Sequence, residues 1–133
     1  MALRRVMIVD DDRFDQLAYK RILRKSDETI EVVSFQYATE ALDYLKTEGR
    51  AELDAILLDI NMPRMNGFEF LEAACRDLQE RFERELVVMV TTSLDPRDRE
   101  RAAGFSQVQA FFSKPLTAEN ISSISALVAK KQA

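Results

Sequence analysis

The chain of 133 residues is 47% hydrophobic and 32% charged, a balance typical of one folded globular domain and not of a disordered segment. Its net charge of −4 argues against nucleic-acid binding, no apolar run reaches the ~20 residues of a membrane span, and histidine is absent. The single cysteine, Cys75, cannot form an internal disulfide, so we expect a reducing, cytoplasmic setting.

Apolar periodicity predicts a regular alternation of strands and helices along the whole chain. Short runs rich in β-branched residues predict strands at 4–9, 29–35, 55–58, 86–90 and 108–112. Apolar residues three or four positions apart predict five helices. The first lies at about 13–25, the second runs from residue 38 to a C-terminal end at Gly49, the third begins at residue 68, the fourth covers 95–103, and the fifth follows a cap at Thr117 or Asn120. This order predicts an α/β fold with a parallel sheet and helices on both faces. We expect a single domain over residues 1–133, with no output domain.

The third predicted helix contains the cysteine. Its apolar face is formed by Phe68, Leu71, Cys75, Leu78 and Phe82. We interpret Cys75 as a small buried hydrophobic residue of that face. Residues 76–85 are strongly charged, and we interpret them as a solvated helix end or loop.

Polar side chains of different types follow four of the predicted strands. Because the carboxyl ends of parallel strands share one edge of the sheet, these side chains are expected to meet: Asp10, Asp11, Asp59, Thr91 and Lys114. Clustered carboxylates repel unless a cation compensates, and oxygen ligands without histidine favour a hard cation such as Mg²⁺. A hydroxyl and an ammonium group would hold phosphate oxygens. This combination predicts phosphoryl transfer to a carboxylate.

Each of these residues also has a local explanation. An aspartate near a helix start often caps that helix, and this applies to residues 10–12 and to Asp59. For Asp12 we favour the helix cap over a position beside the metal. Chance placement of the whole set at one edge is a weaker explanation than a shared site.

The motifs resemble those of a response-regulator receiver domain over essentially the whole chain. The matching segments are Val9-Asp10-Asp11, Leu58-Asp59-Ile60-Asn61-Met62-Pro63 with Gly67, Val90-Thr91 and Ser113-Lys114-Pro115. The resemblance implies a flavodoxin-like (βα)5 fold, doubly wound, with a five-stranded parallel sheet in the order 2-1-3-4-5.

The resemblance also implies a role for each acidic residue. Asp59 would accept the phosphoryl group and contribute to the metal site. Asp11 would bind Mg²⁺ directly, Asp10 would do so more through water, and Asn61 would offer its backbone carbonyl.

On the opposite side of the site, the resemblance implies a switch. Thr91 would move to the phosphoryl group after transfer, and Lys114 would pair with that group. Phe111 would change between outward and inward rotamers, and the Lys114–Pro115 bond would be cis. Two departures bear on partner contacts: Phe111 lacks the hydroxyl of the usual tyrosine, and residues 105–109 replace the usual Gly- and Ala-rich approach to the fifth strand.

Our main hypothesis is a stand-alone receiver in a two-component phosphorelay, a signalling protein and not an enzyme. A histidine kinase or a histidine phosphotransferase would supply the phosphoryl group, and output would pass through contacts with a protein target, without DNA or membrane binding. The charged residues 95–101 leave the oligomeric state open, because they can pair across a homodimer or be solvated.

Two alternatives belong to other functional classes. One is a receiver-fold adaptor that binds its partners independently of phosphorylation. The other is a haloacid-dehalogenase-like phosphatase with Asp10 as nucleophile and Asp12 as its partner in an Asp-x-Asp motif. The phosphatase reading leaves Asp59 unexplained, and the chain lacks a clear cap insertion and a late acidic pair.

Overall fold

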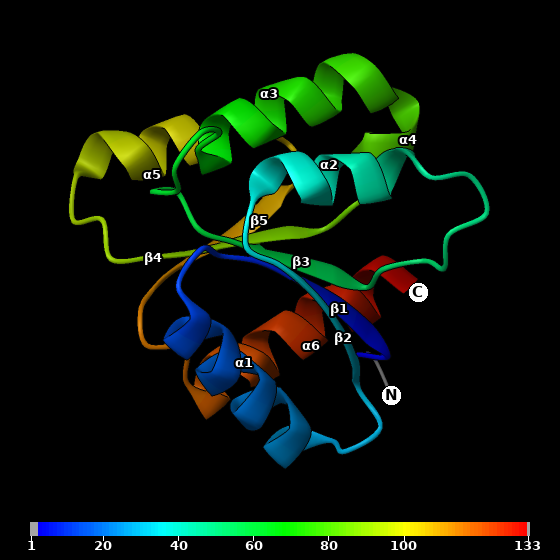
Figure 1. The fold of residues 1–133 in the computed structure, drawn as a ribbon. Helices are drawn as coiled ribbons and strands as arrows, with labels where there is room; N and C mark the ends of the chain where they lie inside the picture. The colour runs from blue at the N-terminus through cyan, green and yellow to red at the C-terminus, as the bar shows by residue number, and fades with distance from the viewer. Residues whose placement is uncertain (1–2, 133) are drawn as a thin grey trace.

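The structure, a computed structural model, describes residues 3–132. Its centre is one sheet of five parallel strands in the order β2-β1-β3-β4-β5, which confirms the predicted fold class and strand order (Figure 1). The strands are β1 (Arg5–Val9), β2 (Glu31–Phe35), β3 (Ala55–Leu58), β4 (Val87–Thr91) and β5 (Val108–Ser113).

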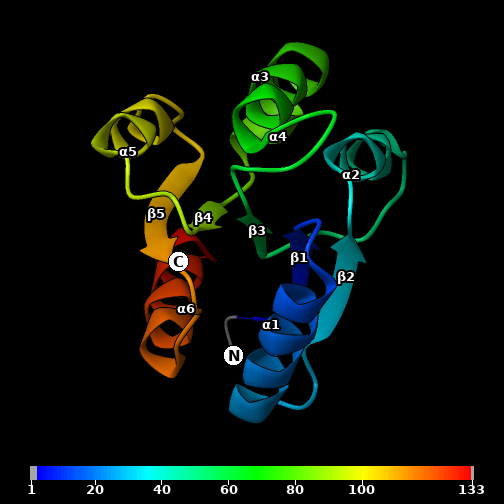
Figure 2. The same cartoon turned by 60° about the vertical axis from the view of Figure 1, so that its left-hand side comes forward.

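Helices cover both faces of the sheet. One face carries α1 (Arg13–Ser26) and α6 (Ala118–Gln132), which contact each other. The other face carries α2 (Ala38–Lys46), α3 (Gly67–Leu78), the short α4 (Glu80–Glu83) and α5 (Pro96–Ala103). Figure 2 shows the two layers on either side of the strands. None of the helices within residues 3–132 is long and apolar enough to cross a membrane.

The central strands are buried on both sides. All four residues of β3 are at most 2% exposed, and their side chains alternate between two cores. Ile56 and Leu58 join the core beneath α2 and α3, whereas Ala55 and Leu57 join the core beneath α1 and α6. Burial on both sides explains why this strand is an unbroken apolar run in the sequence.

Short polar contacts define where the helices begin. The carboxylate of Asp12 accepts the N–H groups of Phe14 and Asp15, which confirms it as the cap of α1. At the start of α6, the side chains of Thr117, just before the helix, and Asn120, in its first turn, each accept the backbone N–H of the other, so both candidate caps take part.

The prediction of one continuous third helix is wrong. Helix α3 ends at Leu78, and Gln79 has a positive φ of 51°, which turns the chain before α4. Phe82 therefore lies on α4, where its ring packs edge-on against Phe70 at a centroid distance of 6.3 Å. Because Leu78 and Phe82 are buried, the charged segment 76–85 is not a simple solvated end.

The predicted end of the second helix also needs correction. Helix α2 ends at Lys46 with Thr47 as its C-cap, whose N–H donates to the carbonyl of Tyr44. Gly49 lies beyond this cap with a φ of +76°, so it serves the following turn instead of closing the helix.

Candidate functional site

The carboxyl edge of the sheet holds its polar residues through the backbone. The N–H of Asp10 donates to Phe35 O, and the N–H of Asp59 donates to Val9 O, each at 3.1 Å. The N–H of Lys114 donates to Thr91 O at 2.9 Å. These bonds continue the strand pairing past the ends of the strands, so the sheet itself fixes where the three side chains begin.

The ammonium group of Lys114 is the centre of the site. Its Nζ lies 2.6 Å from Asp15 Oδ2, 2.9 Å from Asp10 Oδ2 and 3.2 Å from Asp59 Oδ2. Burial lowers the pKa of Lys114, but the hydrogen bonds with Asp15 and Asp10 outweigh burial and hold this pKa above its ordinary value. The lysine is therefore a fixed positive charge among carboxylates.

Asp15 was not among the predicted site residues. It lies in the first turn of α1, where an acidic residue is ordinarily explained by the positive end of the helix dipole. Its contact with Lys114 spans 99 positions of sequence. No local pattern in the sequence points to this ion pair.

Three carboxylates form a group that suits a cation. One oxygen each of Asp10, Asp11 and Asp59 lies within 4.8 Å of the others. Hard oxygen donors without nitrogen or sulfur fit Mg²⁺. Burial raises the pKa of Asp10, although its hydrogen bonds with Lys114 and the backbone of Asp12 oppose this change. A carboxylate that is costly to ionise without a counter-charge is consistent with a cation site. The predicted metal contact of the Asn61 carbonyl stays a prediction.

The loop after β3 shapes the surroundings of Asp59. Asp59 Oδ1 accepts the N–H of Ile60 at 2.8 Å, while Oδ2 faces Lys114. The N–H of Gly67 donates to Ile60 O at 2.8 Å, which brings the start of α3 onto this loop. A Cβ at Gly67 would lie 2.3 Å from the Asp59 carbonyl oxygen, so only glycine fits there without a shift.

Thr91 is connected to helix α5 through Ser93. The fully buried Thr91 accepts the N–H of Ser93 on its Oγ1 at 3.2 Å. The hydroxyl of Ser93 donates to the carboxylate of Asp98 and accepts the N–H of Asp95. Movement of Thr91 would therefore disturb the first turn of α5.

The family model described as the response regulator receiver domain matches residues 6–125. The chain belongs to this family. Response regulator MprA of Mycolicibacterium vanbaalenii is 31% identical over 118 residues, which cover 88% of this chain and 46% of that protein. The chain thus spans about half the length of the curated relatives it matches.

Solved structures agree with the receiver assignment. A two-component response regulator from Cytophaga hutchinsonii has a TM-score of 0.88 and 29% identity, covering 98% of this chain and 99% of that chain. The phosphorylated cyanobacterial phytochrome response regulator RcpA has a TM-score of 0.75 and 28% identity, covering 97% and 91%. The flavodoxin-like architecture inferred from the motifs is confirmed.

In this receiver, Phe111 lies under α5. The ring is half-buried against the core beneath α2 and α3, and the guanidinium carbon of Arg99 lies 4.7 Å from the ring centroid. The guanidinium carbon of Arg101 likewise lies 4.4 Å from the centroid of the Phe68 ring. A guanidinium nitrogen of Arg101 pairs with the Glu72 carboxylate at 2.9 Å. Arginines of α5 thus cover both rings. The predicted rotamer change of Phe111 stays a prediction.

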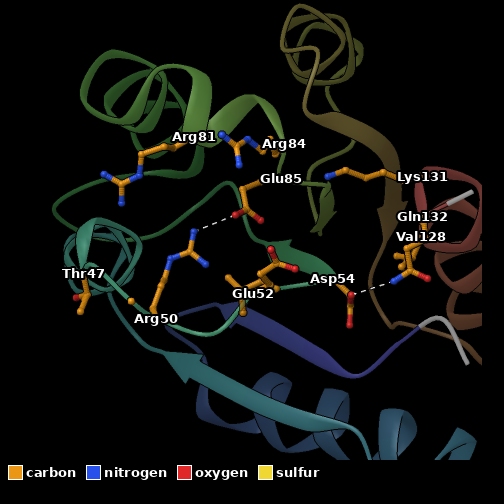
Figure 3. Close-up of a pocket in the computed structure, with 12 residues that line it drawn as sticks. Thr47, Arg50, Glu52, Asp54, Arg81, Arg84, Glu85, Val128, Lys131 and Gln132 are labelled. Carbon is orange, nitrogen blue, oxygen red and sulfur yellow. Dashed lines mark hydrogen bonds and ion pairs between the residues drawn. The ribbon is translucent and has the colours of Figure 1, made fainter.

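A hollow of about 420 Å³ lies at the opposite end of the sheet from Asp59 (Figure 3). In it, Arg50 pairs with Glu85 at 2.9 Å. Asp54 Oδ2 accepts the N–H groups of Arg4 and Arg5 at 2.7 and 3.0 Å. These charges have structural partners, and ligands of open parallel sheets bind at the carboxyl edge. The carboxyl edge that carries Asp59 is therefore the candidate site.

Proposed function

We propose that this receiver accepts a phosphoryl group on Asp59 Oδ2 from the phosphohistidine of a partner kinase or phosphotransferase. The observation that carries the proposal is the convergence of one buried carboxylate, one lysine and a three-carboxylate group. Asp59 Oδ2 lies 3.2 Å from Lys114 Nζ, and Asp59 is also a member of the acidic group. A nucleophile, a positive charge and a cation site together suit phosphoryl transfer.

In the proposed step, Asp59 Oδ2 attacks phosphorus in line with the donor nitrogen. The O–P bond forms as the P–N bond breaks, and the electron pair of that bond stays on the imidazole nitrogen. Lys114 stabilises negative charge on the phosphoryl oxygens, where a charge-assisted hydrogen bond is strong. Mg²⁺ held by Asp10, Asp11 and Asp59 would neutralise charge on the carboxylates and the phosphoryl group.

Exposed apolar side chains support a protein as the donor. Phe14 is 84% exposed and Leu17 is 58% exposed on α1, and Leu94 is 88% exposed in the loop after β4. Both segments start at the carboxyl edge of the sheet. Large apolar side chains exposed beside a polar site are typical of a docking surface.

We further propose that the phosphoryl group draws the Thr91 hydroxyl away from the Ser93 amide. That movement would shift the equilibrium between two arrangements of the face formed by α5, Phe111 and α6. A protein target would bind one of these arrangements. The cytoplasmic location and the homodimer stay predictions.

The acceptor can be tested by intact mass after incubation with Mg²⁺ and acetyl phosphate. We expect the mass of one added phosphoryl group on the wild type and on Asp12→Asn, because asparagine also caps helices. We expect no added mass on Asp59→Asn. Absence of the adduct from the wild type, or its survival in Asp59→Asn, would contradict the proposal.

The two alternative functions give different results. A phosphorylation-independent adaptor would bind its partner equally well with and without the adduct. A phosphatase using Asp10 would turn over a phosphate ester after Asp59→Asn and lose turnover after Asp10→Asn. The phosphatase gains no support from Asp12, whose carboxylate is engaged in capping α1.

A further inference from the structure

Lys114 has three N–H bonds, and the carboxylates of three aspartates lie within ion-pair distance of its Nζ. The shortest contact is with Asp15, at 2.6 Å between Nζ and Oδ2. Asp10 and Asp59 belong to the group that suits a cation, whereas Asp15 does not. A bound cation would neutralise charge on Asp10 and Asp59 but not on Asp15. Asp15 is therefore the partner that would still attract Lys114 with its full negative charge.

The three partners also differ in exposure. The Asp15 side chain is 33% exposed, against 1% for Asp10 and 7% for Asp59. Asp15 belongs to a helix, while Asp10 and Asp59 are held by the strand pairing. It can therefore turn toward solvent without leaving a buried carboxylate unpaired, which neither of the others can do.

We propose that Asp15 is a positioning residue that holds Lys114 at the edge of the site and competes with the phosphoryl group for its ammonium group. The inference rests on the proposed acceptor role of Asp59. A phosphoryl oxygen needs one of the three N–H bonds of Lys114, and all three face carboxylates in this structure. Asp15 thus slows formation of the aspartyl phosphate and shortens its lifetime.

The decisive variant is Asp15→Asn, which keeps the shape of the side chain and removes its charge. At saturating Mg²⁺, we expect phosphorylation by acetyl phosphate to be roughly threefold to tenfold faster, because one N–H bond of Lys114 is released from Asp15 for a phosphoryl oxygen. We expect the aspartyl phosphate to persist longer by a similar factor. Asp15→Glu, which retains the carboxylate, should return both rates toward those of the wild type.

Asp12→Asn is the matched control, because it removes one charge from the start of the same helix, where the Asp12 carboxylate caps α1 and does not pair with Lys114. We expect both rates of this variant to stay within about twofold of the wild type. Equal acceleration by the two variants would mean a general field effect and would overturn the inference. Unchanged or slower phosphorylation of Asp15→Asn would overturn it as well.

A second readout needs no phosphoryl transfer. Without Asp15, Lys114 would bind only Asp10 and Asp59 and would compete more strongly with a cation. Calorimetric titration should therefore show roughly threefold or greater loss of Mg²⁺ affinity in Asp15→Asn and a smaller change in Asp12→Asn. Equal Mg²⁺ affinities of Asp15→Asn and the wild type would overturn the inference.

Failure of the inference is separable from failure of the proposed function. If the wild type forms no adduct on Asp59, the proposed function is wrong. If the wild type forms the adduct and Asp15→Asn behaves like it, only the role of Asp15 is wrong. Circular dichroism melts check that each variant folds, and Asp15→Ser provides a second uncharged side chain suited to a first helical turn.

Discussion

Gly67 and Asp59 meet through their backbones, so closely that a Cβ on Gly67 would lie 2.3 Å from the carbonyl oxygen of Asp59. Gly67→Ala must therefore push the start of α3 away from the strand that carries the acceptor. We expect a loss of about 1–3 kcal/mol in the free energy of unfolding, as for other overpacked sites, together with slower phosphorylation. Urea denaturation and intact-mass kinetics measure the two effects.

Gly49→Ala is the control for this prediction. Gly49 has a φ of +76°, and a Cβ there would meet nothing within 4 Å. We expect a backbone cost of about 1–2 kcal/mol and a normal rate of phosphorylation. If Gly67→Ala is phosphorylated as fast as Gly49→Ala, the close contact does not position Asp59.

Lys114→Gln should destabilise the metal-free protein. The substitution leaves Asp10 and Asp59 as buried carboxylates without their shared counter-charge. We expect a loss of about 2 kcal/mol, less than for a fully enclosed pair because the site opens at the edge of the sheet. Since Mg²⁺ would replace the missing charge, added Mg²⁺ should raise the Tm of Lys114→Gln more than that of the wild type.

A surface ion pair offers the comparison for that prediction. Lys46 and Asp77 lie 2.9 Å apart with the lysine 42% exposed, so Lys46→Gln should leave the Tm and its response to Mg²⁺ unchanged. A Lys114→Gln variant that is as stable as the wild type without Mg²⁺ would contradict the structural role of the lysine.

Arg99 should restrain the ring of Phe111. The cation–π contact at 4.7 Å is exposed, so Arg99→Ala should cost only about 0.5–1 kcal/mol. Its clearer effect would be on motion, seen as increased exchange broadening of the Phe111 ring signals by NMR. Arg101→Ala, which uncovers Phe68 instead, should leave the Phe111 signals unchanged. The restraint is disproved if both variants affect Phe111 equally.

Cys75 should react slowly in the folded protein. Burial raises the pKa of its thiol above the ordinary value of 9.0, and the hydrogen bond from Gln107 only partly opposes this. The pKa of this thiol is higher in the folded than in the unfolded protein, so deprotonation favours the unfolded state. The thiol therefore leaves the stability of the protein unchanged well below pH 9.0 and lowers it as the pH rises past 9.0. The pH profile of iodoacetamide alkylation should lie at higher pH in the native than in the denatured protein.

Gln107→Leu tests the hydrogen bond that opposes that shift. Removing the amide deletes the contact with the sulfur, so the alkylation profile should move to still higher pH. Cys75 is half-buried against the core beneath α2 and α3, and not fully buried as predicted. A native profile that coincides with the denatured one would show that this packing leaves the thiol effectively solvated.

The strands and their polar ends could be predicted from the sequence because parallel sheets impose simple rules. The predicted strand at 55–58 is the observed β3, since burial on both faces requires an unbroken apolar run. The meeting of Asp10, Asp59 and Lys114 follows from the shared direction of the strands. Neither inference needs any knowledge of how the helices are oriented.

The features that were missed depend on such orientation or on unusual backbone. Asp15 reaches Lys114 only because α1 packs with its first turn beside the end of β5, which no local pattern records. Gln79 adopts a positive φ, although glutamine carries no sequence signal for it, so the apolar spacing predicts a continuous helix across the break between α3 and α4.

The backbone bonds that hold Asp10 and Asp59 have a consequence for local opening. Their N–H groups donate to strand carbonyls, so their amide hydrogens should exchange with solvent as slowly as the core of the sheet. The Ser93 amide is instead bound to the hydroxyl of Thr91 and the Asp95 amide to the hydroxyl of Ser93, outside the strand pairing, so both should exchange much sooner. The part of the receiver that would take the phosphoryl group is thus the slowest to open, and the loop that would respond can rearrange many times for each opening of the sheet.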